Sequence, residues 1–438
     1  MHRSNPQPIK IMSAIGRRCQ LLAGGIAILF LSASWVLLIS QARAAAADDE
    51  TSSGTFRRGI AIHDAMNRAT LESSSSNRYL FPPFSDPDHQ MNLAELAIIR
   101  RAGFDFIRLT VDPGPFLQFH GPELDATYGV LRARVEMILE TDLAVIVDFH
   151  PVLHNPEFAP RALVSSTSSP LFAAYCSMLS RTAAVLGAFG SKRVALELIN
   201  EPDTGDSPEA DALWQRMEEK AYRAARAASA SLFLILQGDD IGEVRGLLSL
   251  DARPFAHDRF AAFTFHYYEP FEFTNQSLPN YPNGWTAADV PYPALARPMS
   301  DSMYSLALRL KRANESPIRM VADTALGYEN LVRYRVSNFS RENIHSDFDR
   351  VTNWAHRYGI PSQRIFLGEF GVIRRNGPYQ GARDAERALW LHDVREEAES
   401  HGYFWSIWVY RGYGGMAIVK NGLTSEIDPL TLTALGFR

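Results

Sequence analysis

The chain has 438 residues, of which 46% are hydrophobic and 11% aromatic, and its formal net charge is −5. This composition excludes a disordered, collagen-like or coiled-coil protein. Residues 1–44 carry five basic side chains and no acidic one, so the remainder has 39 basic against 49 acidic residues and a formal charge of −10. Because nucleic-acid binding needs a positive surface, the sequence predicts no nucleic-acid partner.

The N-terminus has the pattern of an export signal. Arg17-Arg18 precedes an apolar run from Leu21 to Ser40, and Ala42-Arg43-Ala44 offers small residues at a cleavage site. We therefore expect residues 1–44 to be a signal peptide, residues 45–55 to be a flexible lead-in, and the mature protein to be secreted or periplasmic. The run is long enough to span a bilayer, so the alternative is an uncleaved anchor in the inner membrane with the protein facing the periplasm.

After the lead-in, short runs rich in β-branched and aromatic residues alternate with longer helical patterns, which is typical of a parallel sheet built from βα units. Eight strands are predicted, at residues 56–62, 104–110, 143–149, 193–199, 232–237, 261–266, 364–370 and 403–409. Helices are predicted near residues 91–102, 126–141, 169–188, 207–229, 241–249, 300–313, 344–358 and 382–400. This order predicts a single α/β domain over residues 56–438, a (β/α)8 TIM barrel.

The connection between the sixth and seventh predicted strands is much longer than the others. Residues 267–343 form an excursion with Pro, Asn, Tyr and Trp, in which one helix is predicted near residues 300–313. Loops at the carboxyl ends of barrel strands usually carry the binding site. We therefore expect this βα6 loop insertion to form walls of a substrate-binding site.

Polar side chains gather at the carboxyl ends of the predicted strands, which form the active face of a barrel. They are His63, Arg108, Asp148, His150, Asn200, Glu201, Gln237, His266, Tyr267, Tyr268, Glu369 and Trp408. Glu201 follows the fourth strand and Glu369 ends the seventh, so the two carboxylates should face each other across the barrel mouth. Retaining glycoside hydrolysis needs such a pair about 5–5.5 Å apart, with one carboxyl as proton donor and the other as nucleophile.

Several short segments resemble glycoside hydrolase family 5, and in particular its cellulase-like members. In chain order they are IRLT, VDFHP, Asn200-Glu201-Pro202, FHYYEPF, Gly368-Glu369-Phe370-Gly371 and FWSIWVY. The resemblance covers residues 56–415. It implies a retaining glycosidase of clan A that hydrolyses a β-glucan by double displacement, with endo-β-1,4-glucanase (cellulase) activity as the first expectation.

The resemblance also implies roles for individual residues. Glu201 is then the general acid/base and Glu369 the nucleophile, which Arg108 and Tyr268 support. Asn200 contacts the sugar 2-hydroxyl, and Trp408 forms the floor under the −1 sugar. His150 and His266 line the site and hold the acid/base. Four further residues are candidate contacts to more distant sugars, namely His63, Asp148, His154 and Trp285.

The sequence leaves several alternatives open. The substrate could instead be a β-1,3-glucan, a mixed-linkage glucan or a mannan. A second class of function is a membrane-anchored, non-catalytic polysaccharide-binding or assembly protein, against which the intact carboxylate pair argues. We expect no metal site, because no His-x-His motif stands on the first strand. Double displacement requires no cofactor, and we expect a monomer whose partner is a β-linked polysaccharide or oligosaccharide.

Overall fold

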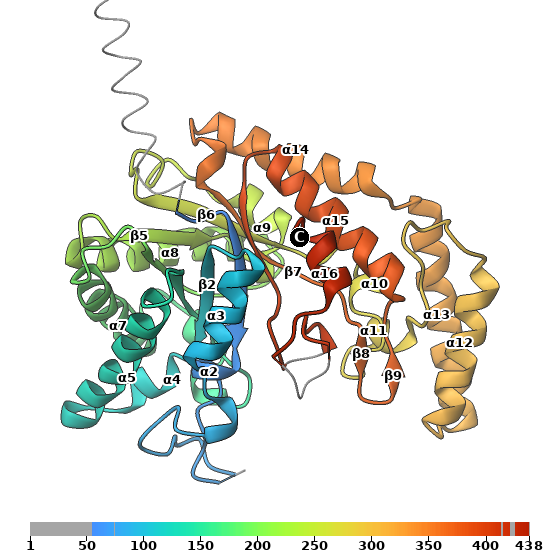
Figure 1. Ribbon diagram of the computed structural model, residues 1–438, viewed down its shortest axis with the longest axis horizontal. Coiled ribbons are helices and arrows are strands. Elements are labelled where there is room, and N and C mark those ends of the chain that lie inside the picture. The colour runs from blue at the N-terminus through green and yellow to red at the C-terminus, as the bar shows by residue number, and fades with distance from the viewer. Residues whose placement is uncertain (1–54, 74, 413–414, 421–424, 438) are drawn as a thin grey trace, which may run out of the picture. The chain divides into compact units, whose positions relative to one another are not determined.

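Eight parallel strands close into a barrel in the computed structural model, which describes residues 55–438 except 74, 413–414, 421–424 and 438 (Figure 1). The strands follow the order β1-β10-β7-β6-β5-β4-β3-β2 around the barrel. They are β1 (Arg58–His63), β2 (Phe106–Val111), β3 (Ala144–Phe149), β4 (Val194–Glu197), β5 (Phe233–Gln237), β6 (Ala261–Tyr267), β7 (Ile365–Phe370) and β10 (Phe404–Ile407). The predicted TIM barrel is confirmed, with every strand at its predicted place.

Helices alternate with the strands along the chain. The longer ones are α3 (Leu93–Ala102), α5 (Gly121–Leu139), α7 (Pro170–Gly187), α8 (Pro208–Ala228), α14 (Arg341–Arg357) and α15 (Asp384–Ser400). The shorter ones are α2 (Asp64–Asn67), α4 (Gly114–Gln118), α6 (Pro160–Leu163), α9 (Val244–Ser249) and α16 (Pro429–Ala434), with 3-10 turns at Pro87–His89, Pro156–Phe158, Asp240–Gly242 and Ser362–Arg364. Ser169 and Ser207 cap α7 and α8, and in both helices a proline takes the first position.

The predicted export segment lies outside the described residues, as does the lead-in up to residue 54. Within the part of the chain that the structure describes, no helix is both long and apolar enough to cross a membrane. The choice between signal peptide and anchor therefore stays a prediction from the sequence.

The interior of the barrel changes from apolar to polar along the strands. Phe56, Phe106, Phe366 and Phe404 form an aromatic floor where the strands begin, and the rings of Phe366 and Phe404 stack with their centroids 4.4 Å apart. Successive side chains of a strand point to opposite faces, so every second residue points inward. The next inward residues are polar on four neighbouring strands, namely Arg108, Asp148, Glu197 and Gln237. The candidate site is built on this polar layer.

The pairing of β6 with β7 contains a register shift. After Phe265 the pairing continues from His266 to Glu369, so Gly368 is left as the extra residue of β7. Such a bulge re-aims the side chains beside it, and here Glu369 turns inward to lie 2.5 Å from Arg108. A Cβ atom on Gly368 would lie 2.5 Å from the hydroxyl of Thr264 and 3.0 Å from the ring of His266. Only glycine fits this position without displacing these side chains.

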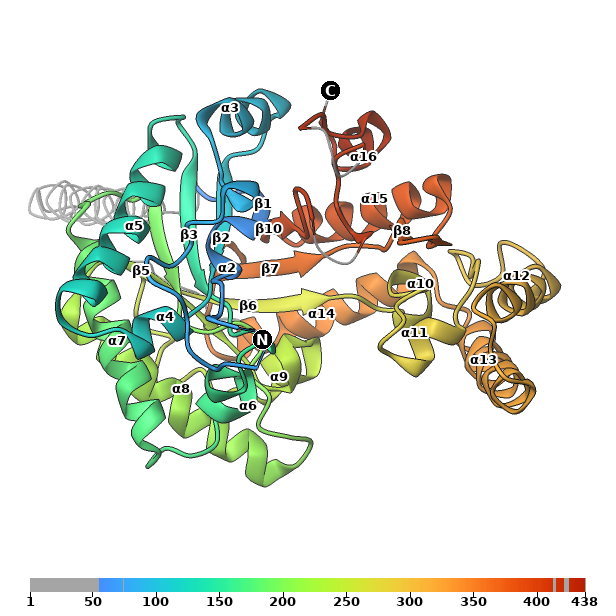
Figure 2. The same cartoon turned by 90° about the horizontal axis from the view of Figure 1, so that it is seen from below.

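The connection from β6 to β7 is helical for much of its length. Before α14 it contains α10 (Phe271–Thr274), α11 (Pro282–Thr286), α12 (Met299–Arg312) and α13 (Pro317–Ser337), and the hairpin β8 (Arg375–Asn376) and β9 (Tyr379–Gln380) follows β7. Figure 2 shows α12 and α13 side by side, with α10 and α11 between them and the barrel strands. The sequence prediction missed α13, because its buried face includes Gly327, Asn330 and Tyr334 and so lacks a clear apolar stripe.

The insertion has a small core of its own. It consists of the buried side chains of Trp285, Ala288, Leu306 and Leu310. Beside this core, the buried guanidinium of Arg309 donates hydrogen bonds to the main-chain oxygens of Trp285 at 2.7 Å and Ala287 at 2.5 Å. A Cβ atom on Gly327 would lie 2.5 Å from Leu306 Cδ2 and 3.0 Å from the main-chain oxygen of Thr286. The insertion is therefore a packed helical subdomain, in which α13 approaches its neighbours closely at a glycine.

Replacing Gly327 with alanine tests this close approach. The added methyl overpacks the core of the insertion, and we expect the free energy of unfolding to fall by about 1–3 kcal/mol. Gly129→Ala in α5 is the matched control, because a Cβ atom there meets nothing within 4 Å. Alanine at position 129 should raise the free energy of unfolding by about 0.5–1 kcal/mol. Urea unfolding measures both, and stabilisation by both alanines would contradict the packing described.

Candidate active site

Glu201 and Glu369 face each other at the carboxyl ends of the strands. Glu201 lies in the loop after β4, Glu369 lies in β7, and one ligand atom from each of Glu201, His266 and Glu369 lies within 4.8 Å of the others. Glu201 has a φ angle of +47°. The left-handed region costs a non-glycine residue about 1–2 kcal/mol, and strained backbone of this kind gathers at functional sites. The structure thus brings the two predicted carboxylates together.

Arg108 is fully buried and joins three carboxylates. Its guanidinium forms two hydrogen bonds with Glu197, of 2.8 and 2.9 Å, and lies 3.0 Å from Asp148 and 2.5 Å from Glu369. It also donates to Asn200 Oδ1 at 2.8 Å. Burial alone opposes the charge of the guanidinium, but the three carboxylates outweigh this effect and raise the pKa of Arg108. Arg108 therefore fixes both Glu369 and Asn200 in place.

Each oxygen of Glu369 accepts a hydrogen bond. Arg108 Nη1 donates to Oε1 at 2.5 Å, and the phenol of Tyr268 donates to Oε2 at 2.7 Å. Both donors stabilise the ionised carboxylate. The cluster of Glu201, His266 and Glu369 has the residue types of a metal site, but a cation there would compete with these two donors for Glu369. The arrangement suits a carboxylate nucleophile better than a metal ligand.

Gln237 and His266 hold Glu201 in a closed ring of hydrogen bonds. The main-chain N–H of Glu201 donates to Gln237 Oε1 at 2.5 Å, so the amide NH2 of Gln237 is left to donate to His266 Nε2 at 3.1 Å. This network assigns the ring proton of His266 to Nδ1, which donates to Glu201 Oε1 at 2.8 Å. The ring uses Oε1 of Glu201 and leaves Oε2 as the oxygen that can carry a proton.

Burial shifts the proton affinity of three groups in this layer. It raises the pKa of Glu201, and it raises the pKa of Asp148 to about 7. Burial also lowers the pKa of His266 to about 4. At mildly acidic pH these shifts favour a protonated Glu201 beside a neutral His266. The carboxyl group of Glu201 is thus positioned by a side chain that carries no charge.

Aromatic rings of three residues pack together beside the carboxylates. The rings of Trp408 and His150 are nearly parallel, at 9°, with their centroids 5.5 Å apart, and His63 meets Trp408 edge-on at 5.0 Å. The hydroxyl of Thr110 lies 3.1 Å from His63 Nδ1. The peptide bond from Trp408 to Val409 is cis. The structure thus brings Trp408, His63 and His150 together in one group.

His150 does not hold Glu201 as the sequence analysis expected. Its Nδ1 lies 2.9 Å from Asp148 Oδ2, and its Nε2 lies 3.4 Å from the amide nitrogen of Asn200. His266 makes the contact with Glu201. Asp148 is fully buried between Arg108 and His150, so it supports the site from beneath and is not placed to contact a distant sugar.

Two of the predicted residues belong to other clusters. His154 is partly exposed, lies 4.0 Å from Asp112 and packs its ring against Tyr79. Trp285 packs against Tyr379 in the core of the insertion. Neither position joins the group around the two carboxylates. That these residues contact more distant sugars stays a prediction.

Two residues of the site had no predicted role. Glu197 was assigned to an apolar strand, but it is the carboxylate that binds Arg108 through two hydrogen bonds. Gln237 was recognised only as a strand end, and it closes the ring on Glu201. The charge of Glu197 inside the apolar run from Val194 to Ile199 was the signal that could have revealed its role. A carboxylate is buried in a strand only where a partner matches its charge.

Replacing Gln237 with glutamate tests the hydrogen-bonded ring. An ionised carboxylate only accepts, so it would favour a proton on His266 Nε2 in place of Nδ1. We expect the native protein to show the Nδ1–H tautomer, neutral down to about pH 4, and Gln237→Glu to show the Nε2–H tautomer. Imidazole ¹⁵N chemical shifts report both, with His266→Ala used to assign the signal. Gln215→Glu in α8 is the control and should leave the tautomer unchanged; an Nε2–H tautomer in the native protein would contradict the assignment.

Comparisons with known proteins agree with this geometry. The family model described as cellulase, glycosyl hydrolase family 5, matches residues 80–413. Among solved structures, the cellulose synthase subunit Z (CcsZ) of Clostridioides difficile has 21% sequence identity and a TM-score of 0.58, covering 87% of this chain and 99% of its own.

The endoglucanase Cel5A of Thermotoga maritima has 19% identity and a TM-score of 0.61, covering 89% of this chain and 99% of its own. Its complex with mannotriose gives 18% identity, a TM-score of 0.60, and 88% and 99% coverage. At such identities these structures show the shared fold, and a comparison with curated proteins gives no match. The family model covers most of the chain, which therefore belongs to glycoside hydrolase family 5 and is a glycoside hydrolase.

Proposed function

We propose that this glycoside hydrolase is a retaining endo-β-1,4-glucanase in which Glu369 is the nucleophile and Glu201 the acid/base. The observation that carries the proposal is the different surroundings of two carboxylates whose ligand atoms lie within 4.8 Å of each other. Glu369 accepts from a guanidinium and a phenol, whereas Glu201 is held by a neutral histidine. Inverting enzymes separate their carboxyl groups by about 6.5–9.5 Å to admit a water molecule, so the short separation favours retention.

The first step transfers the glycosyl group to the enzyme. A carboxylate oxygen of Glu369 attacks the anomeric carbon while the bond from that carbon to the glycosidic oxygen breaks. Glu201 passes its proton to the departing oxygen, so the leaving sugar departs as an alcohol and the other sugar is held as an ester on Glu369. His266 then donates through Nδ1 to the carboxylate of Glu201.

The second step returns the enzyme to its starting state. Glu201, now ionised, takes a proton from a water molecule whose oxygen attacks the anomeric carbon. The ester bond to Glu369 breaks with its electron pair, and that carboxylate is restored to its contacts with Arg108 and Tyr268. Two displacements at one carbon leave its configuration unchanged, so the product keeps the anomeric form of the substrate.

We propose that two neighbouring side chains hold the −1 sugar. Asn200 is oriented by its contact with Arg108, which supports a hydrogen bond from its amide to the sugar 2-hydroxyl. Trp408 lies against the rings of His150 and His63, and this packing supports an indole floor under the pyranose.

Activity should follow the proton on Glu201. Because burial raises its pKa, the acid form persists above the ordinary glutamate value of about 4.3. The rate falls as the pH rises through this raised value, since the leaving group then lacks a proton. The high-pH limb of the activity profile therefore reports the proton on Glu201.

The related structures guide the choice of substrate. Structures of Cel5A of Thermotoga maritima are described in complex with cellobiose and with mannotriose. A β-1,4-linked glucan is therefore the first substrate to assay, and β-mannan, β-1,3-glucan and mixed-linkage glucan complete the panel.

Replacing either glutamate with glutamine tests the assignment. Glu369→Gln removes the nucleophile and Glu201→Gln removes the proton donor, and we expect each to lower kcat on a soluble β-1,4-glucan by at least about 10³-fold. Glu399→Gln is the matched control, because Glu399 pairs with Arg58 at the start of β1, at the opposite end of the barrel. Reducing-end release measures all three variants.

Two results would contradict the proposal. Full activity of Glu369→Gln would show that Glu369 is not the nucleophile. An inverted anomer in ¹H NMR of the first product would exclude double displacement. A native protein that binds the glucans of the panel without cleaving any of them would instead favour the polysaccharide-binding or assembly function.

We also propose that the chain is exported, and that residues 1–44 are removed. The basic, apolar and small-residue order of this segment supports the proposal. Sequencing the N-terminus of the protein recovered from its native cells decides between cleavage and anchoring: a start near residue 45 is expected, and an intact segment in the membrane fraction would establish the anchor.

A further inference from the structure

The outer face of α13 carries a stripe of apolar side chains that are open to solvent. Ile318, Val321, Tyr328 and Val336 are 84%, 73%, 55% and 80% exposed, and Ala325 is exposed among them. The opposite face of the helix holds its buried residues and packs against the rest of the insertion. Figures 1 and 2 show α13 beside α12, away from the barrel strands.

The stripe has the spacing of a contact between two helices. Along α13 it consists of Ile318, Val321, Ala325, Tyr328 and Val332, which follow one another at alternating steps of three and four residues, with Val336 after them. This spacing repeats every seven residues and keeps one narrow line of side chains facing a partner helix. α13 therefore packs on one face within the insertion and presents a second packing face to the outside.

The charges beside the stripe favour a protein partner over a membrane surface. The exposed charged residues of α13 are Arg319, Glu329 and Arg333, so both signs occur. Arg319 pairs with Glu315 at 3.3 Å, and Arg335 donates to main-chain oxygens of the insertion. Helices that lie on membranes have a polar face rich in Lys and Arg. This helix lacks such a face.

We propose that the stripe packs against the same stripe of a second copy of this chain, with the two α13 helices antiparallel. A two-fold axis between Leu326 and Gly327 brings Ala325 opposite Tyr328 of the second copy. The same axis brings Val321 opposite Val332 of the second copy. The smallest side chain of the stripe then meets the largest, which is the complementarity that close packing needs.

The exposed area of the stripe matches what one side of a stable dimer needs. At about 150 Å² for a fully exposed residue of this size, the four exposed fractions correspond to roughly 400–500 Å². A standard interface buries about 800 Å² on each partner, and about 65% of it is apolar in homodimers. The stripe supplies most of that apolar share. The dimer replaces the monomer that the sequence alone leads us to expect.

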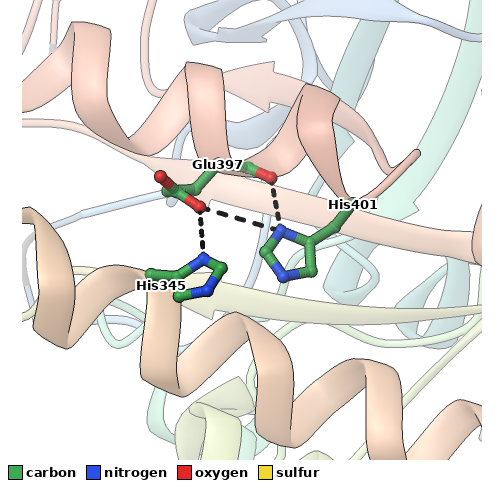
Figure 3. A group of neighbouring side chains, drawn as sticks. All are labelled: His345, Glu397 and His401. Carbon is green, nitrogen blue, oxygen red and sulfur yellow. Dashed lines mark hydrogen bonds and ion pairs between the residues drawn. The ribbon is translucent and has the colours of Figure 1, made fainter.

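The insertion that carries the stripe is fastened to the barrel. α14 follows α13 in the chain, and Glu397 of α15 joins α14 to α15. Figure 3 shows His345 and His401 turned toward Glu397: His345 Nδ1 lies 2.9 Å from its carboxylate, and His401 Nδ1 lies 2.8 Å from its main-chain oxygen. A surface on a fixed element loses little conformational freedom on association, which favours binding.

Sedimentation of the protein purified from its native cells tests the proposal. At about 10 μM we expect the native protein to have twice the mass of one chain, and its Tm to rise with protein concentration. Val321→Asp and Tyr328→Asp place a charge in the contact, so each should sediment as a single chain. Leu389→Asp is the matched control and should remain a dimer, because Leu389 is 42% exposed on α15. Near-UV circular dichroism shows that the variants are folded.

Cysteine substitutions test the antiparallel alignment. The two-fold axis places Val321 beside Val332 of the second copy, whereas the two copies of Val321 lie about 16 Å apart along the helix axis. Mild oxidation of Val321→Cys combined with Val332→Cys should therefore give a covalent dimer, and Val321→Cys alone should not. Cys176, the native cysteine of the described residues, is buried.

The proposal is overturned if the native protein sediments as a single chain up to about 100 μM, or if Val321→Asp remains a dimer. A single chain that floats with phosphatidylglycerol vesicles, and loses this binding in Val321→Asp, would assign the stripe to a membrane surface instead. A covalent dimer of Val321→Cys alone would overturn the antiparallel alignment. None of the substituted residues belongs to the catalytic network, so these outcomes are independent of the proposed function.

Discussion

The polar layer of the barrel depends on one buried cation. A guanidinium without contact with water costs several kcal/mol unless its charge and its hydrogen bonds are matched. Arg108, on β2, is matched by carboxylates on three other strands: Asp148 on β3, Glu197 on β4 and Glu369 on β7. A shift of any of these strands by one residue would turn its carboxylate to the opposite face. The electrostatic requirement of Arg108 therefore ties the register of the barrel to the geometry of the active site.

The same polar layer explains how Glu201 and Glu369, two identical side chains, come to have different surroundings. Three carboxylates surround a single guanidinium, so the layer carries a surplus of negative charge, and burial raises the pKa of Asp148 to about 7. Glu369 lies on the side of the cation and the phenol, whereas Glu201 is held by a histidine that burial keeps neutral. Different surroundings of two carboxyl groups are the general basis of acid and nucleophile pairs.

Much of this arrangement could be predicted from the sequence, for a physical reason. Strands buried on both faces give continuous apolar runs, and polar residues at their carboxyl ends meet at one face, so the eight strands and the pair Glu201 and Glu369 were accessible. The role of Glu197 was not accessible from the sequence. Its partner Arg108 lies on β2, two strands away from β4, and the two side chains meet only when β2, β3 and β4 pair in register. The direction of the His266 proton depends on Gln237, 29 residues away. The helix α13 escaped prediction because its contact face relies on Gly327.

The left-handed backbone conformation of Glu201 affects which residues evolution can keep at this position. Position 201 would be occupied at lower conformational cost by glycine, or by asparagine, which tolerates positive φ better than other residues. Selection for a stable fold alone would therefore drive this position away from glutamate. A protein that keeps glutamate there gives up folding free energy for its side chain, which is the trade between stability and activity expected of an enzyme. In relatives of this fold that have lost the reaction, we expect glycine or asparagine to replace glutamate at this position, even where the barrel and its buried arginine persist.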